Sequence, residues 1–110
     1  MTIKAKTFGI VTIHPERIYF ERDTIFRGHE FTTGNKVTIK GLEEFEFGIS
    51  RGLGDECGKF VITELKTGRT LYANLYKHRS IAASQVSDNI LRDGIEHVRQ
   101  VINEANKENQ

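Results

Sequence analysis

The chain has 110 residues, of which 37% are hydrophobic and 28% charged, a balance typical of one globular domain rather than of a disordered chain. Its 16 basic and 15 acidic residues give a net charge of +1, without the basic excess expected of a nucleic-acid or membrane-surface binder. Apolar runs stay far below the roughly 20 residues that cross a bilayer, and the polar first residues with the single Cys57 predict a cytoplasmic protein.

Most of the chain alternates apolar and polar residues in short segments, which is the pattern of β-strands. We expect about seven strands between residues 3 and 76, all in one domain that spans residues 1–110. The clearest strand is expected over residues 43–49, where Phe45, Phe47 and Ile49 share one face.

Glycine, proline and small polar residues predict the connections between these strands. His14-Pro15-Glu16-Arg17 indicates a tight turn, because proline presets a turn dihedral and has no amide hydrogen. Thr32-Thr33-Gly34-Asn35 is also turn-like, and Lys66-Thr67-Gly68-Arg69 indicates a hairpin. A glycine-rich loop is expected after Arg51.

The period changes to that of a helix near the end of the chain. Apolar residues recur there at steps of three and four, which places them along one side of a helix over residues 87–106. Ser87 is the expected N-cap, and Gly94 is expected to be tolerated within the helix. Residues 81–86 form either an earlier helical turn or a loop that carries small apolar residues. The stripe that should be buried comprises Leu91, Ile95, Val98 and Ile102.

This order of elements resembles the pleckstrin-homology-like (PH-like) family, in particular its short bacterial members. The residues that carry the resemblance are Phe8-Gly9-Ile10-Val11-Thr12 leading to Arg17–Arg22, Lys36–Ile39 through Phe45–Phe47, Gly58–Ile62, and Leu91–Glu96. The resemblance implies an antiparallel β-barrel or sandwich of about seven strands, capped by a C-terminal helix. It also implies a protein-interaction or assembly module, since the bacterial members are similar to such modules.

The residues that could act in catalysis or bind a metal lack the spacing or the surroundings that these roles require. His14, His29, His78 and His97 do not lie three or four residues apart, and the acids beside Cys57 oppose a reactive thiolate. The loop Arg51-Gly52-Leu53-Gly54 lacks the lysine and the following helix of a phosphate-binding loop. We therefore predict no catalytic residue, no metal, no cofactor and no enzyme.

The predicted contact surface is built around the last strand. Tyr72 and Tyr76 should lie on its outer face beside Lys77 and Arg79, and exposed tyrosines with cations are typical of protein interfaces. Arg51 and Leu53 form the second candidate. Packing of the final segment over the tyrosines is an equally weighted alternative.

The function predicted from these features is recognition of a protein partner, or of a second copy of the chain, through a surface patch. The first alternative is a binder of phospholipid head groups or nucleic acid, because tyrosines and cations also stack and attract such ligands. A small enzyme is the remaining alternative, since folding can assemble a site from residues that are distant in sequence.

Overall fold

The computed structural model describes residues 4–24, 28–51 and 59–108 of the chain. In these residues six strands form one sheet, and two helices follow. The elements are β1 (Lys6–Phe8), β2 (Val11–Thr24), β3 (Gly28–Ile39), β4 (Phe47–Arg51), β5 (Phe60–Glu64), β6 (Thr70–Tyr76), α1 (Arg79–Asp93) and α2 (Ile95–Glu108).

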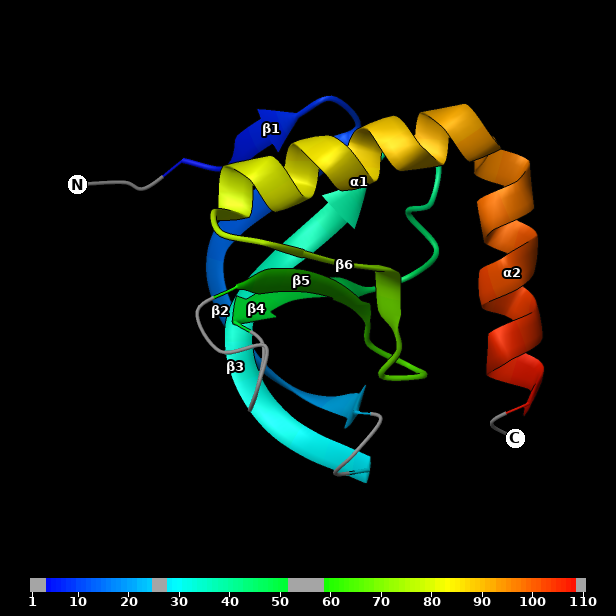
Figure 1. Cartoon of the computed structure of the whole chain (residues 1–110), viewed down its shortest axis with the longest axis horizontal. Helices are drawn as coiled ribbons and strands as arrows, with labels where there is room; N and C mark the ends of the chain where they lie inside the picture. The colour runs from blue at the N-terminus through cyan, green and yellow to red at the C-terminus, as the bar shows by residue number, and fades with distance from the viewer. Residues whose placement is uncertain (1–3, 25–27, 52–58, 109–110) are drawn as a thin grey trace.

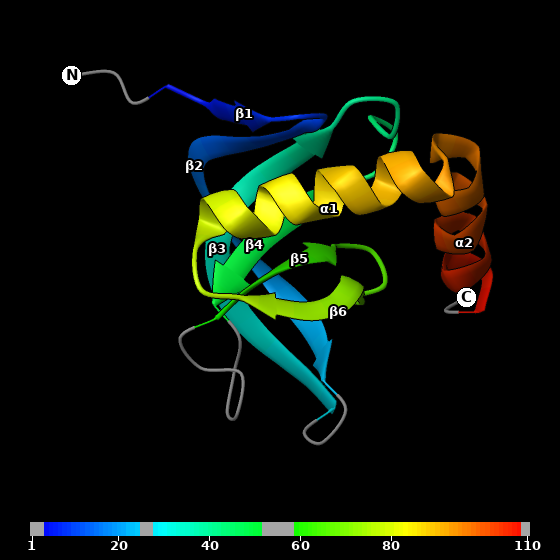
Figure 2. The same ribbon diagram turned by 45° about the horizontal axis from the view of Figure 1, so that its top comes forward.

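The strands follow one another across the sheet in chain order, and every pairing is antiparallel. The β1–β2 connection is tight, because only Gly9 and Ile10 lie between the paired residues Phe8 and Val11. Gly9 has a φ of 61°, which glycine adopts without strain at the first position of a two-residue hairpin turn. Figure 1 and Figure 2 show the resulting meander, with α1 laid across it.

β2 continues through the segment where the sequence predicts a tight turn. Its pairing with β3 shifts between Ile13 and Arg17, so that residues 14–16 together face only Lys36. Pro15 cannot donate a hydrogen bond to a strand ladder, and the bulge removes this requirement. The predicted turn is therefore wrong, because the proline produces a bulge inside one long strand.

The turn predicted over residues 32–35 also lies inside a strand. Gly34 is buried in β3, and a β-carbon at this position would lie 2.1 Å from the backbone oxygen of Ile49 in β4. The glycine thus allows two strands to approach closely and does not reverse the chain.

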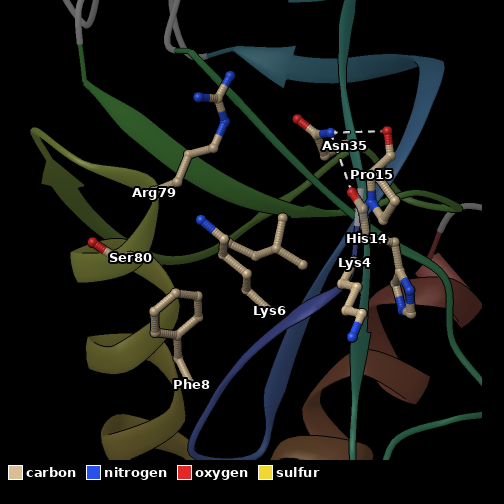
Figure 3. A pocket seen from close by; sticks show the side chains of 9 residues that line it. Lys4, Lys6, Phe8, His14, Pro15, Asn35, Arg79 and Ser80 are labelled. Carbon is tan, nitrogen blue, oxygen red and sulfur yellow. Dashed lines mark hydrogen bonds between the residues drawn. The ribbon is translucent and has the colours of Figure 1, made fainter. Parts of the chain in front are cut away.

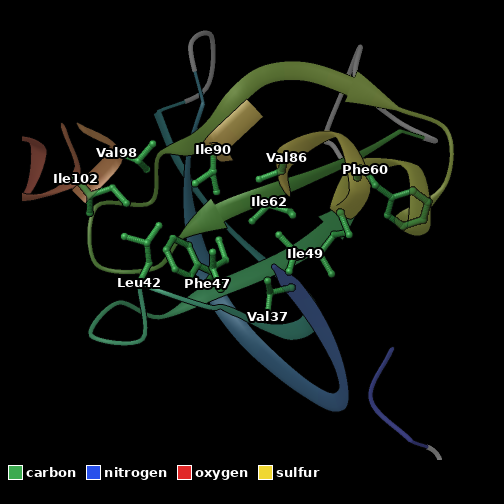
Figure 4. Packing of buried hydrophobic residues seen from close by; sticks show 14 residues of the cluster. Val37, Leu42, Phe47, Ile49, Phe60, Ile62, Val86, Ile90, Val98 and Ile102 are labelled. Carbon is green, nitrogen blue, oxygen red and sulfur yellow. The ribbon is translucent and has the colours of Figure 1, made fainter. Parts of the chain in front are cut away.

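The main core lies between one face of the sheet and the helices (Figure 4). Fully burying a large aliphatic or aromatic side chain stabilises the fold by roughly 1.5–3 kcal/mol, so these contacts fix where the helices lie. The buried residues are Val11, Val37, Ile39, Phe47, Ile49, Phe60 and Ile62 of the strands, Leu42 of the turn before β4, and Ala82, Ala83, Val86, Ile90, Val98 and Ile102 of the helices.

The opposite face of β4 is covered by the outer half of β2, because the sheet coils back on itself. Phe20 of β2 and Val61 of β5 are buried but lie outside the main core. A β-carbon on Gly48 of β4 would lie 2.7 Å from a ring carbon of Phe20, so the glycine leaves space for this ring. The side chains of β2 therefore alternate, with Ile18, Phe20 and Arg22 directed inward and Arg17, Tyr19 and Glu21 directed outward.

α1 packs against β1 and β2 at one edge of the sheet and against β5 and β6 at the other edge. The edge strands β1 and β6 are not paired with each other, so the sheet is open and α1 bridges its edges. A mainly β domain with C-terminal helical structure is confirmed, whereas the seven-stranded barrel or sandwich is wrong for the described residues. Two of the predicted turns lie inside β2 and β3, so two long strands replace four short ones.

The predicted single helix over residues 87–106 is also wrong. α1 already begins at Arg79, and Ser87 is a buried residue within it rather than an N-cap. Gly94 has a φ of 96° and its N–H donates a 2.8 Å hydrogen bond to the Ile90 carbonyl oxygen, which ends α1 before α2 starts. The glycine therefore separates two helices.

Only part of the predicted apolar stripe is buried. Val98 and Ile102 are buried and Ile95 is half-buried, but Leu91 is 56% exposed and Ile90 is buried in its place. The break at Gly94 changes the direction of the chain, so one helical repeat cannot describe both helices. In Figure 1 α2 runs away from the end of α1 at a steep angle.

Candidate functional site

Tyr72 does not lie on an open outer face of β6 as predicted. The strand bulges, so that residues 72–75 face only Val61 of β5. Tyr72 has a φ of 54°, a left-handed conformation that is uncommon for aromatic residues. As a result both Leu71 and Tyr72 pack partly buried against the core, and the alternation of a regular strand is lost.

The Tyr72 hydroxyl donates a 2.8 Å hydrogen bond to a carboxylate oxygen of Asp93, the last residue of α1. Burial, followed by this hydrogen bond, raises the pKa of the Tyr72 phenol above its usual value of 10.0. Hydrogen bonds from Arg92 and then from Tyr72 lower the pKa of Asp93 below its usual value of 3.8. For Tyr72 the alternative expectation, packing under the final segment, is therefore the correct one.

The other predicted contact residues divide into two groups. Lys77 is exposed, whereas Leu53 and the side chain of Tyr76 lie outside the described residues. Arg79 begins α1 and Tyr72 contacts its last residue, so they mark helix ends roughly 20 Å apart. The predicted patch around Tyr72 and Arg79 therefore does not form one surface.

Arg51 and Arg79, taken from the two predicted surfaces, come together at one ring. The guanidinium carbon of Arg79 lies 4.5 Å from the centroid of the Phe60 ring, and that of Arg51 lies 5.6 Å from it. Both arrangements are cation–π contacts, which contribute about 0.5–1 kcal/mol at exposed sites. Phe60 is itself buried in the core, so it holds both cations at a fixed place on the surface.

Arg79 also lines a pocket of about 490 Å³, which we call the basic pocket (Figure 3). It lies where β1, the bulge of β2 and the first turn of α1 meet. Its lining residues are Lys4, Lys6, Phe8, Ile13, His14, Pro15, Asn35, Arg79 and Ser80. Three cationic side chains and an imidazole thus share one hollow, and among the described residues none that lines it is acidic.

The bulge of β2 shapes one wall of the basic pocket. The Asn35 side-chain amide donates hydrogen bonds to the backbone oxygens of His14, at 3.1 Å, and Pro15, at 3.5 Å. A ring nitrogen of His14 is 2.8 Å from the Thr38 hydroxyl, which fixes the imidazole against β3. These contacts hold the wall in place without using the lysines or Arg79.

The first turn of α1 adds a favourable field for negative charge. The side chain of the N-cap residue, His78, makes no capping hydrogen bond, and no acidic residue lies in the first turn. Backbone N–H groups at a helix start carry partial positive charge, which lowers the energy of a nearby anion. The helix end therefore adds to the effect of the cationic side chains.

A second pocket, of about 410 Å³, is lined by Glu44, Glu46 and Glu64 among others. The buried Glu64 carboxylate accepts hydrogen bonds from the backbone N–H of Lys66 and from the backbone and hydroxyl of Thr67. This carboxylate therefore stabilises the β5–β6 turn. Across the described residues no cluster of three or more His, Cys, Asp or Glu side chains could hold a metal ion.

Lys4, Lys6 and His14 line the basic pocket but are not among the contact residues predicted from the sequence. A signal was present for the lysines, because residues two apart in an extended segment lie on the same face. The approach of Arg79, by contrast, depends on how α1 docks across the sheet.

No helix in the described parts of the chain is long and apolar enough to span a membrane. Comparison of the chain with protein-family models, with curated proteins and with solved structures finds no match. The likeness to the PH-like family therefore stays a prediction, and function has to be argued from the basic pocket.

Proposed function

We propose that the chain is a non-enzymatic protein-interaction module that binds an acidic segment of a partner protein in the basic pocket. The observation that carries this proposal is the lining, where Lys4, Lys6, His14 and Arg79 meet and the described part of the chain contributes no acidic residue. Carboxylates would find several charged donors there, and charge-assisted hydrogen bonds are roughly twice as strong as neutral ones. The lone Cys57 favours a cytoplasmic setting for such a module.

Apolar residues in the lining favour a protein segment over a compact phosphate. Phe8, Ile13 and Pro15 contribute apolar surface between the cations, which suits a segment that combines acidic and apolar side chains. In Figure 3 Lys4 and His14 lie together at one side of the basic pocket, and Arg79 lies at the other side. Charges spread in this way match an extended chain better than one small anion.

Arg79 is the strongest single contact in this proposal. Its guanidinium already rests on the Phe60 ring at 4.5 Å, so less side-chain freedom is lost when a carboxylate binds. A planar guanidinium can also form two parallel hydrogen bonds to one carboxylate. Arg79 therefore supplies orientation, whereas the two lysines supply charge.

The test is a binding titration followed by fluorescence polarisation, with a labelled peptide that alternates glutamate and leucine. We expect saturable binding that weakens as salt is raised, because the exposed charges are screened. The double variant Lys6→Glu with Arg79→Glu should weaken binding by at least about tenfold, the effect of losing one or two charge-assisted hydrogen bonds.

The matched control is the double variant Lys40→Glu with Lys107→Glu, which changes the net charge by the same amount at exposed residues outside the pocket lining. It should bind the peptide like the unaltered protein. Equal weakening by both variants would contradict the proposal, since it would reflect net charge alone. Failure to bind the peptide, together with binding to anionic phospholipid vesicles or single-stranded DNA, would replace it with the corresponding alternative.

A further inference from the structure

The outward side of the β2–β3 hairpin carries an exposed aromatic pair that the basic pocket does not use. Tyr19 is 68% exposed and Phe31 is 58% exposed. Their rings stack with centroids 5.1 Å apart and planes inclined by 11°. The stack forms a flat apolar platform, and exposed apolar surface of this kind is typical of contact sites between proteins.

Charged residues flank this platform with opposite signs. Arg17 precedes Tyr19 by two residues on β2 and Glu21 follows it by two, so all three side chains project from the same side of the strand. Arg17 is held in place because its guanidinium donates hydrogen bonds to the side-chain amide oxygen of Asn35, at 3.3 Å, and to the Thr33 hydroxyl, at 3.2 Å. The order along the strand is thus cation, aromatic ring, anion.

This order of charges is complementary to the same face of a second copy whose strands run in the opposite direction. A two-fold axis that runs across the strands places Tyr19 opposite Tyr19 of the other copy. The same operation places Arg17 of each copy opposite Glu21 of the other. A carboxylate accepts more than one hydrogen bond, so Glu21 can receive this guanidinium beside any contact within its own chain. With the strands in the same direction, like charges would meet and repel each other.

We propose that the outward face of Arg17, Tyr19, Glu21, Phe31 and Thr33 is a self-association surface that pairs two copies of the chain about a two-fold axis. This inference concerns a surface and a partner different from those of the acidic-segment proposal, and either can fail alone. The face spans only two strands, so we expect it to bury less than the roughly 800 Å² per partner of a standard interface. The dimer should therefore be weak and readily reversible.

The first measurement is sedimentation equilibrium over a range of protein concentrations. We expect the mass to rise from the monomer value of 12.6 kDa toward twice that value. The double variant Tyr19→Ser with Phe31→Ser should stay monomeric at every concentration. The control is Leu91→Ser, which removes a 56% exposed apolar side chain from α1 and should associate like the unaltered protein.

Exchanging the charges of Arg17 and Glu21 tests whether a second copy of the chain binds to this face. Arg17→Glu and Glu21→Arg should each weaken self-association by at least about tenfold, because each leaves two pairs of like charges in the dimer. Mixed together, these two variants should form a heterodimer, since one presents only acids and the other only bases. One chain that carries both substitutions should regain the association of the unaltered protein.

Three outcomes would overturn the proposal. The first is an unaltered protein that stays monomeric at all concentrations. The second is a Leu91→Ser variant that lowers association as much as the aromatic double variant. The third is a mixture of the two charge variants that associates no better than either alone. Circular dichroism of each variant checks that the fold is retained, and peptide binding by the Tyr19→Ser, Phe31→Ser variant tests the basic pocket separately.

Discussion

The backbone N–H of Ile10 donates a 2.9 Å hydrogen bond to the Ser87 hydroxyl, which joins the β1–β2 turn to the middle of α1. The two residues are 77 positions apart in the sequence. Ser87 is buried and Ile10 is half-buried, so water does not readily replace this contact.

Replacing Ser87 with alanine should therefore destabilise the fold by about 1–2 kcal/mol, because the Ile10 N–H loses its partner. Urea unfolding followed by circular dichroism measures the change. Ser84→Ala is the reference, since Ser84 lies exposed in the same helix and gains the same helix propensity. Equal stability of the two variants would mean that the contact contributes nothing.

Replacing Gly9 with alanine should lower the free energy of unfolding more than Ser87→Ala does, because backbone strain and a steric clash add. Gly9 has a φ of 61°, and a β-carbon there would lie 2.1 Å from the Ser87 oxygen. Gly28 has a similar φ of 69°, but a β-carbon there would meet no atom of the described residues within 4 Å. Gly28→Ala should therefore show only the backbone cost of roughly 1–2 kcal/mol, and Gly9→Ala should unfold at a clearly lower urea concentration.

The hydrogen bond between Tyr72 and Asp93 should make the stability of the fold decrease at alkaline pH. Folding raises the pKa of the Tyr72 phenol above its unfolded value of 10.0. The stability that the phenol contributes is therefore fully present below pH 10.0, and it is lost as the pH rises through the pKa of the folded state. Tyr72→Phe should lower the free energy of unfolding by less than about 1 kcal/mol near neutral pH.

The test compares urea unfolding of the unaltered protein and of Tyr72→Phe at about pH 8 and about pH 11. The unaltered protein should lose more stability over this interval, since the variant has no phenol to ionise at this position. Parallel losses in both proteins would show that the Tyr72 pKa is not raised by folding.

Arg99 attaches α2 to the turn before β4, so loss of its side chain should loosen this helix. Its guanidinium donates to the Glu44 carboxylate at 2.7 Å, to the Gly41 carbonyl oxygen and to Glu96. Arg99→Met should remove all three contacts and lower the urea concentration at which the protein unfolds, and amide hydrogen exchange should accelerate in α2. Glu96→Gln keeps the two contacts that reach the turn before β4, so its hydrogen exchange should stay close to that of the unaltered protein.

The sequence was informative where local periodicity and tertiary packing agree. Alternation in β4 correctly placed Phe47 and Ile49 on one face, and the helical repeat correctly identified Val98 and Ile102 as buried. It left the first part of α1 open between a helical turn and a loop, because the buried face there begins with the small residues Ala82 and Ala83, which give no strong apolar signal.

The candidate site was harder to predict than the fold, because it depends on contacts between distant segments. Arg79 was singled out for its neighbours in sequence, yet the cations that join it are Lys4 and Lys6 at the other end of the chain. Tyr72 was misplaced because a bulge with a φ of 54° is not visible in a pattern of alternation. Both errors come from geometry that only the docked helix and the curved sheet define.

The bridging position of α1 also has a consequence for synthesis on the ribosome. β2 and β3 are adjacent in the chain and can pair soon after they emerge, because closing a short loop costs little entropy. β1, although made first, gains its contact with α1 only after Ser87 has left the exit tunnel. The turn after the first strand is therefore tied down only when nearly the whole domain has been translated.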